Sequence, residues 1–410
     1  TMNIPRCLVG MLFLLGTTSV GLVAPPLLGG AEASLRNRVR CWHHLSQRGQ
    51  GITVAILDSG WKGWREARGK VLPATVEARS FRADGDLEAR ESVHGILCAE
   101  VVHALAPEAR LLLANWEPDV PRSFLAAVRW AREQGAQILS CSMIMPGWSD
   151  GEGNGPVHEQ LARLLGDDAL FIASAGNTAC RHWGGPFNPD RLGLHQWKPG
   201  CIENELLPYG ASLSVELVHG EEAVFDLVVV NLLSRDIVGR TRSSGIGWRH
   251  AAVRFEVEQS QRYAVRVERV RGTGRFHLTI LGGGLTHCTS AGSIPFPGDG
   301  AKVLTVAATD EQGQRLPFSS CGPAGRFPKP DLAARVPVSV KWRPEAPFSG
   351  TSAAAPQVAG IAALLWSAEP HLDAKAMRAR LTKATSSGGK RHDPKVGYGV
   401  IQFRTTTEKK

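Results

Sequence analysis

The chain has 410 residues, of which 43% are hydrophobic and 21% are charged, and its formal net charge is +9 at pH 7. These values exclude a disordered or fibrous protein and leave enough apolar material for one large globular domain with an additional module. The basic residues are scattered and do not form the basic, aromatic-interleaved stripe of a nucleic-acid reader. We therefore expect no nucleic-acid partner, and we interpret the positive charge as a solvated face.

Residues 1–33 have the pattern of a secretory signal peptide. A short, weakly basic start leads into a mostly apolar run at residues 8–23, and small residues follow. Glycines and the pair Pro25 and Pro26 interrupt this run before it reaches the roughly 20 residues of a spanning helix. No later run is long and apolar enough to span. We predict no stable membrane span, and a secreted or periplasmic bacterial protein whose mature chain begins near Ser34.

The chain contains 8 cysteines, and Cys7 lies inside the predicted signal peptide. An odd number then remains, so at least one thiol is expected to be free. If the protein is exported, our preferred disulfide joins Cys180 and Cys201, which flank a loop rich in Gly, Pro and Trp. Cys98 and Cys141 lie in predicted core elements and are expected to be buried. No grouping of Cys and His has the spacing of zinc ligands, so no metal site is assigned.

Short apolar runs alternate with helical patterns along most of the chain. The apolar runs predict buried strands, and the spacing between them predicts helices at residues 123–134 and 157–165. The predicted strands, in chain order, are residues 52–57, 111–114, 138–143, 170–174 and 303–307. This alternation is typical of a doubly wound α/β domain with a mainly parallel sheet, in which active sites lie beyond the carboxyl ends of the strands.

The alternation of strand and helix patterns stops between residues 203 and 284. There, strand-like runs are connected by Gly, Ser and Asn, and no helical pattern is evident. These runs are residues 212–218, 223–230, 252–258 and 263–270. We interpret the segment as an antiparallel β module inserted into the α/β domain. The predicted domain order is a signal peptide (1–33), the first part of the α/β domain (34–202), the inserted β module (203–284), the second part of the α/β domain (285–403) and a disordered tail (404–410).

Two motifs place titratable residues at the ends of predicted elements. The first predicted strand ends at Asp58, which Ser59 and Gly60 follow. A carboxylate there either orients a catalytic base or simply caps the next element. The pair His94 and Gly95 begins an apolar run with a helical pattern, although a lone histidine at a helix start is more often structural.

Ser352 lies in a third and more specific motif, Gly-Thr-Ser-Ala-Ala-Ala-Pro, which runs into an apolar helix that reaches Trp366. The small residues predict a helix that is buried on every side. The backbone N–H groups and the dipole at its N-terminus favour developing negative charge. A serine there could act only as an N-cap. That role does not explain the small residues on both sides of Ser352, which let a substrate carbonyl approach the backbone closely.

These motifs, together with the Ser-Ala-Gly-Asn turn at residues 174–177, resemble the subtilisin-like serine peptidases, or subtilases. The order of aspartate, histidine and serine along the chain is that of subtilisin. The resemblance covers most of residues 51–399 and includes residues 318–323 and 329–332, shortly before Ser352. The inserted β module resembles one that some bacterial subtilases carry.

The resemblance implies a role for each residue. Ser352 is expected to be the nucleophile, His94 the general base that takes its proton, and Asp58 the residue that orients the imidazole. Asn177 is expected to donate its side-chain amide to the oxyanion, together with the Ser352 backbone N–H. The implied activity is hydrolysis of peptide bonds through an acyl-enzyme by a secreted serine endopeptidase. Its expected partner is a protein or peptide substrate, and the oligomeric state stays open.

The resemblance also implies two walls of a substrate-binding site. The expected substrate-binding residues are Ser142, Met143, Ile144, Ser174, Ala175 and Gly176. Because these walls are small and uncharged, we expect an apolar or aromatic substrate residue just before the cleaved bond. A basic residue there needs a nearby carboxylate, and the nearest candidates, Asp150 and Glu152, lie in a Gly-rich loop of unknown position.

Two departures from the family pattern leave alternatives open. Ile96 stands where the family usually has a small hydroxyl residue, although no proton-transfer group is lost. The interval between the predicted signal peptide and the first strand is too short for a folded pro-domain. A specialised processing protease with one cognate precursor therefore stays open beside a general endopeptidase. A binding protein that has lost catalysis is a third alternative, which the intact catalytic residues disfavour.

No cofactor is expected to be required for this chemistry. Relatives often bind structural Ca²⁺ through carboxylates and carbonyl groups of loops. Structural Ca²⁺ is compatible with this sequence, but no self-contained loop for it can be assigned.

Overall fold

The computed structural model of the chain describes residues 39–323 and 325–402. The signal peptide predicted at 1–33 and the tail predicted at 404–410 therefore lie outside the described residues. None of the helices in the described part combines the length and the apolar character that a membrane crossing requires.

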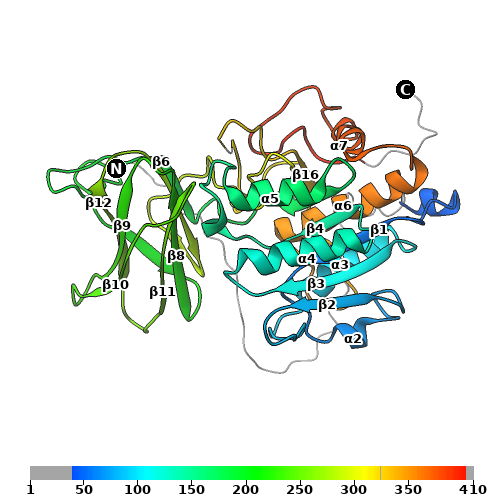
Figure 1. Cartoon of the computed structure of the whole chain (residues 1–410), viewed down its shortest axis with the longest axis horizontal. Coiled ribbons are helices and arrows are strands. Elements are labelled where there is room, and N and C mark those ends of the chain that lie inside the picture. Colours follow the sequence, from blue (N-terminus) through cyan, green and yellow to red (C-terminus); the bar gives the residue numbers. More distant parts are fainter. Residues whose placement is uncertain (1–38, 324, 403–410) are drawn as a thin grey trace.

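A seven-stranded sheet forms the centre of the larger part of the molecule (Figure 1). Its strands, from one edge to the other, are β16 (Leu332–Arg335), β15 (Val303–Thr309), β5 (Leu170–Ser174), β4 (Ile138–Cys141), β1 (Thr53–Leu57), β3 (Arg110–Trp116) and β2 (Glu77–Phe81). All neighbouring strands are parallel, which confirms the predicted α/β fold. The chain order reverses between β1 and β4, and ligands bind at such reversal points in open α/β sheets.

Helices pack on both faces of this sheet because its strands are apolar on both sides. On β1, Val54 and Ile56 belong to one hydrophobic layer, whereas Ala55 and Leu57 belong to the other. The first layer includes α3 (His94–Leu105) and α6 (Thr351–Ala368), and the second includes α4 (Pro121–Glu133) and α5 (Pro156–Leu165). Helices α4 and α5 confirm the two helices predicted from apolar spacing. The further helical elements are α2 (Trp64–Ala67), η1 (Pro146–Trp148) and α7 (Ala374–Lys383).

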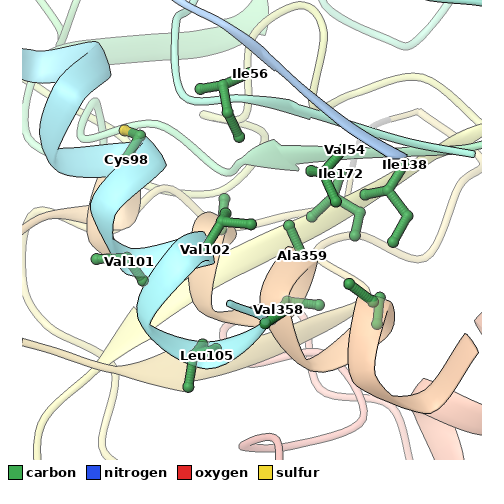
Figure 2. Close-up of a cluster of buried hydrophobic side chains, with 14 of the residues drawn as sticks. Val54, Ile56, Cys98, Val101, Val102, Leu105, Ile138, Ile172, Val358 and Ala359 are labelled. Carbon is green, nitrogen blue, oxygen red and sulfur yellow. The ribbon is translucent and has the colours of Figure 1, made fainter. Parts of the chain in front are cut away.

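Helices α3 and α6 pack directly against each other. Figure 2 shows Val102 and Leu105 of α3 beside Val358 of α6, next to the sheet. The approach is close at Gly360, where an added Cβ would lie 2.7 Å from the Leu105 Cβ. The small residues of α6 therefore let the two helices come together.

Two antiparallel sheets form the smaller part of the molecule, on the left in Figure 1. The five-stranded sheet contains β10 (Ile237–Arg242), β9 (Val224–Asn231), β12 (Tyr263–Arg271), β7 (Asn204–Pro208) and β14 (Gly283–Leu285). The four-stranded sheet contains β11 (Arg249–Glu256), β8 (Ser212–His219), β13 (Arg275–Leu281) and β6 (His182–Pro186). One apolar core, with Phe225 and Phe276 at its centre, draws on both sheets. Strand β6 lies upstream of residue 203, where the module is predicted to begin.

The cysteines differ in part from expectation. Cys98 and Cys141 are buried, as predicted. The preferred disulfide between Cys180 and Cys201 is not formed, because Cys201 is a free thiol whose Sγ lies 3.1 Å from the Glu203 carbonyl oxygen. The loop that connects the two residues extends into the β sandwich through β6, and sequence spacing does not reveal this path.

The close contact of α3 and α6 predicts that Gly360→Ala destabilises the fold. The new methyl group meets the Leu105 side chain, so the two helices must move apart. We expect the free energy of unfolding to fall by about 1–3 kcal/mol, the usual cost of overpacking. Urea denaturation followed by circular dichroism measures the change. Gly210→Ala is the matched control, because an added Cβ there meets nothing within 4 Å. Equal stability of the two variants contradicts the argument.

Candidate active site

Asp58 lies directly after β1 and is fully buried. Its Oδ1 accepts hydrogen bonds from the backbone N–H groups of Ser59, at 2.8 Å, and Gly60, at 2.9 Å. Its Oδ2 accepts a hydrogen bond from His94 Nδ1 at 2.7 Å. The two backbone bonds hold the carboxylate in place beside the imidazole.

His94 is the first residue of α3. The next residue must be small, because a Cβ on Gly95 would lie 2.9 Å from both the Asp58 Cβ and the Trp61 ring. The ring of Phe348 packs edge-on against the imidazole at 5.6 Å between centroids. Burial alone would lower the pKa of His94, but the Asp58 carboxylate raises this pKa well above its ordinary value.

Ser352 is the second residue of α6, which begins after Gly350. Gly350 has a φ of 91°, a conformation that side chains rarely adopt, and an added Cβ would lie 3.0 Å from Asn177 Nδ2. The Ser352 hydroxyl lies 3.4 Å from the Ser142 carbonyl oxygen. No hydrogen bond joins this hydroxyl to His94 within the described part of the chain, and such bonds are often long before a substrate binds.

Asn177 faces the start of α6. Its Oδ1 accepts hydrogen bonds from the backbone N–H and the hydroxyl of Thr351, both at 3.0 Å. These donors identify the oxygen of the amide. The amide nitrogen Nδ2 then lies on the Gly350 side, and no residue in the described ranges accepts a hydrogen bond from it. The site therefore contains an unused N–H donor near Ser352.

Thr351 was not singled out by sequence reasoning, although it sits beside Ser352 in the Gly-Thr-Ser motif. Its hydroxyl donates to Asn177 Oδ1 and accepts a hydrogen bond from the Gly176 backbone N–H at 3.2 Å. One side chain therefore links the turn at Gly176 and Asn177 to the start of α6. Its position directly before Ser352 in the motif was the sequence feature that could have identified Thr351 as part of the site.

The structure brings together some of the predicted substrate-binding residues. The Ser142 hydroxyl donates to the Ser352 carbonyl oxygen at 3.2 Å. An added Cβ on Gly176 would lie 3.4 Å from Ile144 Cγ2, so the two predicted walls face each other. Met143 and Ile144 are partly exposed. The remaining predicted residues, Ser174 and Ala175, are 1% and 0% exposed, and their side chains lie beneath the surface.

The two acidic candidates for a basic-residue pocket already have partners. The Asp150 carboxylate accepts hydrogen bonds from the Asn154 side chain at 2.7 Å and from the Glu152 backbone N–H at 2.8 Å. The Glu152 carboxylate accepts a hydrogen bond from His277 Nε2 of strand β13 at 2.9 Å. This bond is the main cause that lowers the pKa of Glu152 below its ordinary value.

His277 lies between His182 and Glu152 and contacts both through its ring nitrogens. His182 Nδ1 lies 2.9 Å from the Thr289 carbonyl oxygen and must donate to it. Burial, with the nearby His277, lowers the pKa of His182 to about 3, so His182 is neutral and its Nε2 accepts from His277 Nδ1 at 3.0 Å. On its other side, His277 Nε2 donates to the Glu152 carboxylate at 2.9 Å. An ion pair therefore joins the β sandwich to the loop that follows the predicted substrate wall.

Cys98 lies beside Asp58 and His94. Its Sγ is 3.9 Å from Asp58 Oδ2, and burial raises the pKa of this thiol. The ligand atoms of Asp58, His94 and Cys98 lie within 4.8 Å of one another, the one such grouping of potential metal ligands in the described ranges. A metal there would have to break the hydrogen bond between Asp58 and His94, since both would be ligands. The absence of a metal site thus stays a prediction.

Comparisons with known proteins agree with the geometry. The model of the subtilase family, Peptidase_S8, matches residues 274–399. Over 119 residues, 29% of its length, the chain is 30% identical to alkaline elastase YaB of Bacillus sp. strain YaB and covers 30% of that protein. It is 32% identical over 133 residues to the halolysin-like extracellular serine protease Nep of Natrialba magadii, matching 32% of this chain and 24% of that one. The chain thus covers less than a third of the length of these relatives.

The fold agrees over a much longer part of the chain. The structure is similar to that of the Clostridium perfringens CspB protease, with a TM-score of 0.65 and 15% sequence identity, covering 91% of this chain and 96% of that chain. At this identity the likeness shows the fold alone. Residues 274–399 are therefore similar in sequence to the subtilase family, and most of the chain shares the fold of the CspB protease.

The ion pair of Glu152 and His277 predicts that Glu152→Gln destabilises the fold in a pH-dependent way. The pKa of Glu152 is lower in the folded state than in the unfolded state. The pair therefore stabilises the folded protein at pH values above the unfolded-state pKa of about 4.3. This stabilisation is lost as the pH falls through the folded-state pKa. Glu152 is partly exposed, so we expect a loss of roughly 1 kcal/mol at pH 7 that shrinks in acid. Urea denaturation from pH 7 to pH 3.5 measures it.

The matched control for this prediction is Glu159→Gln. Glu159 lies on α5, where its exposed carboxylate pairs with Arg163 at 3.4 Å. We expect a smaller loss for this variant, of about 0.5 kcal/mol or less. A difference between Glu152→Gln and wild type that does not change with pH contradicts the assigned ion pair.

Proposed function

We propose that the protein is a serine endopeptidase of the subtilisin type, with Ser352 as nucleophile, His94 as general base and Asp58 as the residue that orients His94. The observation that carries this proposal is the 2.7 Å hydrogen bond between the buried Asp58 carboxylate and His94 Nδ1. That bond places the proton of the neutral imidazole on Nδ1, so Nε2 is the atom with a free electron pair. Basic Nε2 is the atom that accepts a proton from serine in such triads.

The reaction then follows from the positions of these groups. Ser352 Oγ attacks the carbonyl carbon of the substrate while its proton passes to His94 Nε2, and the imidazolium that forms is stabilised by Asp58. The same proton passes to the leaving amine as the carbon–nitrogen bond breaks, which leaves an acyl-enzyme. Water then attacks the acyl carbon while one of its protons passes to His94, and His94 gives this proton to Ser352 Oγ as the ester bond breaks, which releases the acid product and restores the enzyme. These side chains supply every proton transfer, so the proposed chemistry requires no cofactor.

The oxyanion is stabilised by donors at the start of α6. The Asn177 Nδ2 amide has an unused N–H, and its orientation is fixed by Thr351. The backbone N–H of Ser352 lies at the N-terminus of α6, where the helix dipole favours negative charge. A preorganised donor of this kind contributes about 3–4 kcal/mol to transition-state stabilisation in subtilisin.

The proposed substrate is a protein or peptide with an apolar residue before the cleaved bond. Ile144 offers apolar surface opposite Gly176, and its neighbour Met143 is also partly exposed. Asp150 and Glu152, the acidic candidates nearby in sequence, are held by Asn154 and His277 instead. An isolated substrate cation in the pocket would be costly without a carboxylate.

We also propose that the protein acts outside the cytoplasm. The predicted signal peptide at residues 1–33 supports export. The name of the Natrialba magadii relative describes that protein as extracellular. N-terminal sequencing of protein recovered from the medium or periplasm tests this proposal, and we expect a start near Ser34.

The assignment of the nucleophile predicts the behaviour of Ser352→Ala. Wild-type protein is expected to react covalently with a fluorophosphonate probe, and the variant is expected to lose both labelling and at least about 10,000-fold of kcat/KM. Ser367→Ala, on the same helix, is the matched control and should retain both. Intact circular dichroism of Ser352→Ala separates loss of chemistry from loss of fold. Labelling that persists in Ser352→Ala contradicts the proposal.

The raised pKa of His94 predicts an alkaline shift in the pH profile. Only neutral imidazole accepts the serine proton, so activity is lost as the pH falls through the His94 pKa, which lies well above 6.5. We expect kcat/KM for a peptide substrate to rise with pH along a limb whose midpoint is above 6.5. Asp58→Asn should move this midpoint down, because the charge that raises the pKa is removed. A wild-type midpoint at or below 6.5 counts against this account of His94.

The uncharged walls predict the specificity. Among matched chromogenic peptides with Phe, Leu, Arg or Lys before the scissile bond, we expect kcat/KM to be at least about tenfold higher for Phe or Leu than for the basic pair. Glu152→Gln should not change this ratio, because His277 already binds the Glu152 carboxylate. A preference for Arg or Lys that Glu152→Gln abolishes shows instead that Glu152 reaches the substrate.

A further inference from the structure

A second concave site lies on α7, built from residues that take no part in the proposed chemistry. It is a cavity of about 470 Å³ between one face of α7, the loop before β16 and the loop that follows α7. This volume falls within the usual range for small-molecule sites, about 300–1,000 Å³.

Cations line this basic pocket. Lys375, Arg378 and Lys383 come from α7, where their spacing places them along one side of the helix. Lys329 comes from the loop before β16. Among the lining residues, all within the described ranges, Asp331 is the one acidic side chain. Four cations therefore face one carboxylate, which leaves an excess of three positive charges.

Asp331 is already neutralised within the fold. Its Oδ2 accepts hydrogen bonds from Lys329 Nζ and from the Thr305 backbone N–H, both at 2.8 Å, and its Oδ1 accepts from the Arg378 guanidinium. Burial alone would raise the pKa of Asp331, but Arg378 and Lys329 lower it. The carboxylate therefore has little capacity left for the other two lysines.

Lys375 and Lys383 have no ion-pair partner among the residues that the structure describes. Both are exposed at the rim of the pocket. The buried pair of Lys329 and Asp331, with Arg378, could serve stability alone. That role does not account for a hollow of this size with two further unpaired lysines at its rim. An unpaired cation cluster around a cavity concentrates anions.

We propose that this basic pocket binds a small polyanion that carries phosphate groups. Lysine suits phosphate because it offers a compact point charge. Arg378 adds positive charge, although its guanidinium already donates to Asp331 and to the Ala301 and Val303 carbonyl oxygens. The net charge of the pocket matches a ligand with several negative charges better than a single carboxylate. The same chemistry is presented by a free phosphate compound and by an anionic lipid headgroup.

Lys329 gives the proposal a second readout. Burial lowers the pKa of Lys329 to about 8, so near pH 8 part of the population is neutral. A bound anion stabilises the charged form of Lys329, and binding at pH 8 therefore takes up a fraction of a proton. Binding to exposed lysines alone does not produce this uptake.

The test uses the full chain with Ser352→Ala, which prevents self-digestion and lies outside the basic pocket. Isothermal titration with inorganic pyrophosphate at constant ionic strength should give saturable binding, at least tenfold weaker in Lys375→Gln/Lys383→Gln. The matched control is Lys70→Gln/Lys198→Gln, which removes two exposed lysines elsewhere and should change affinity less than twofold. Equal affinities of the two double variants, or no binding at 10 mM pyrophosphate, overturn the proposal.

Three further measurements test the site and identify the ligand. Sulfate does not titrate near pH 8, so any proton taken up when it binds is taken up by the protein. Comparing the binding enthalpy of sulfate in buffers of different ionisation enthalpy measures this uptake by Lys329. If no proton is taken up, the assignment of this pocket is wrong. Citrate that binds as tightly as pyrophosphate overturns the choice of phosphate. The protein is also sedimented with phosphatidylglycerol vesicles. If it binds the vesicles and pyrophosphate releases it, the natural ligand is a lipid headgroup. If it binds pyrophosphate but not the vesicles, the ligand is a soluble compound.

Discussion

The active-site region depends on the hydrogen bond between the buried Asp58 carboxylate and His94. A buried charge is costly unless it is paired and hydrogen-bonded. Here the backbone N–H groups of Ser59 and Gly60 bind one oxygen and His94 binds the other. Two consequences follow from one arrangement, since both carboxylate oxygens have hydrogen-bond partners and the imidazole is held in a single tautomer. The turn after β1 therefore decides the chemistry of a residue on α3.

Small residues allow the close helix contacts that bring Ser352 near Asp58 and His94. Gly95 lets α3 approach the Asp58 side chain, and Gly360 lets α6 approach Leu105. Both helices pack on the same face of the sheet, and their first turns meet, since Cys98 Sγ of α3 lies 3.6 Å from the Ser352 carbonyl oxygen of α6. Thr351 then ties the start of α6 to the turn that carries Asn177. The site is thus assembled at helix ends, by backbone positions that tolerate little change.

The parts of this arrangement that sequence could predict are local. A buried strand that ends in a carboxylate and a small-residue helix after Ser352 have recognisable patterns, and they indicated the α/β fold and the candidate residues. The parts that it did not predict depend on contacts between distant segments. Thr351 meets Asn177 across 174 positions, and His277 meets Glu152 across 125 positions. Strand β6 contains two glycines and a proline, so its sequence alone favours a loop.

The contact of His277 with Glu152 also connects the β sandwich to the loop beside the proposed substrate site. The loop that carries Glu152 continues directly from the wall at Met143 and Ile144, and the sandwich holds this loop at several points. Trp248 Nε1 donates to the Gly147 carbonyl oxygen at 3.1 Å, and His277 binds Glu152 at 2.9 Å. A sandwich that only extended the surface would not need a buried histidine at this contact. Its position argues that the inserted strands hold the loop in place and keep its carboxylates away from the substrate.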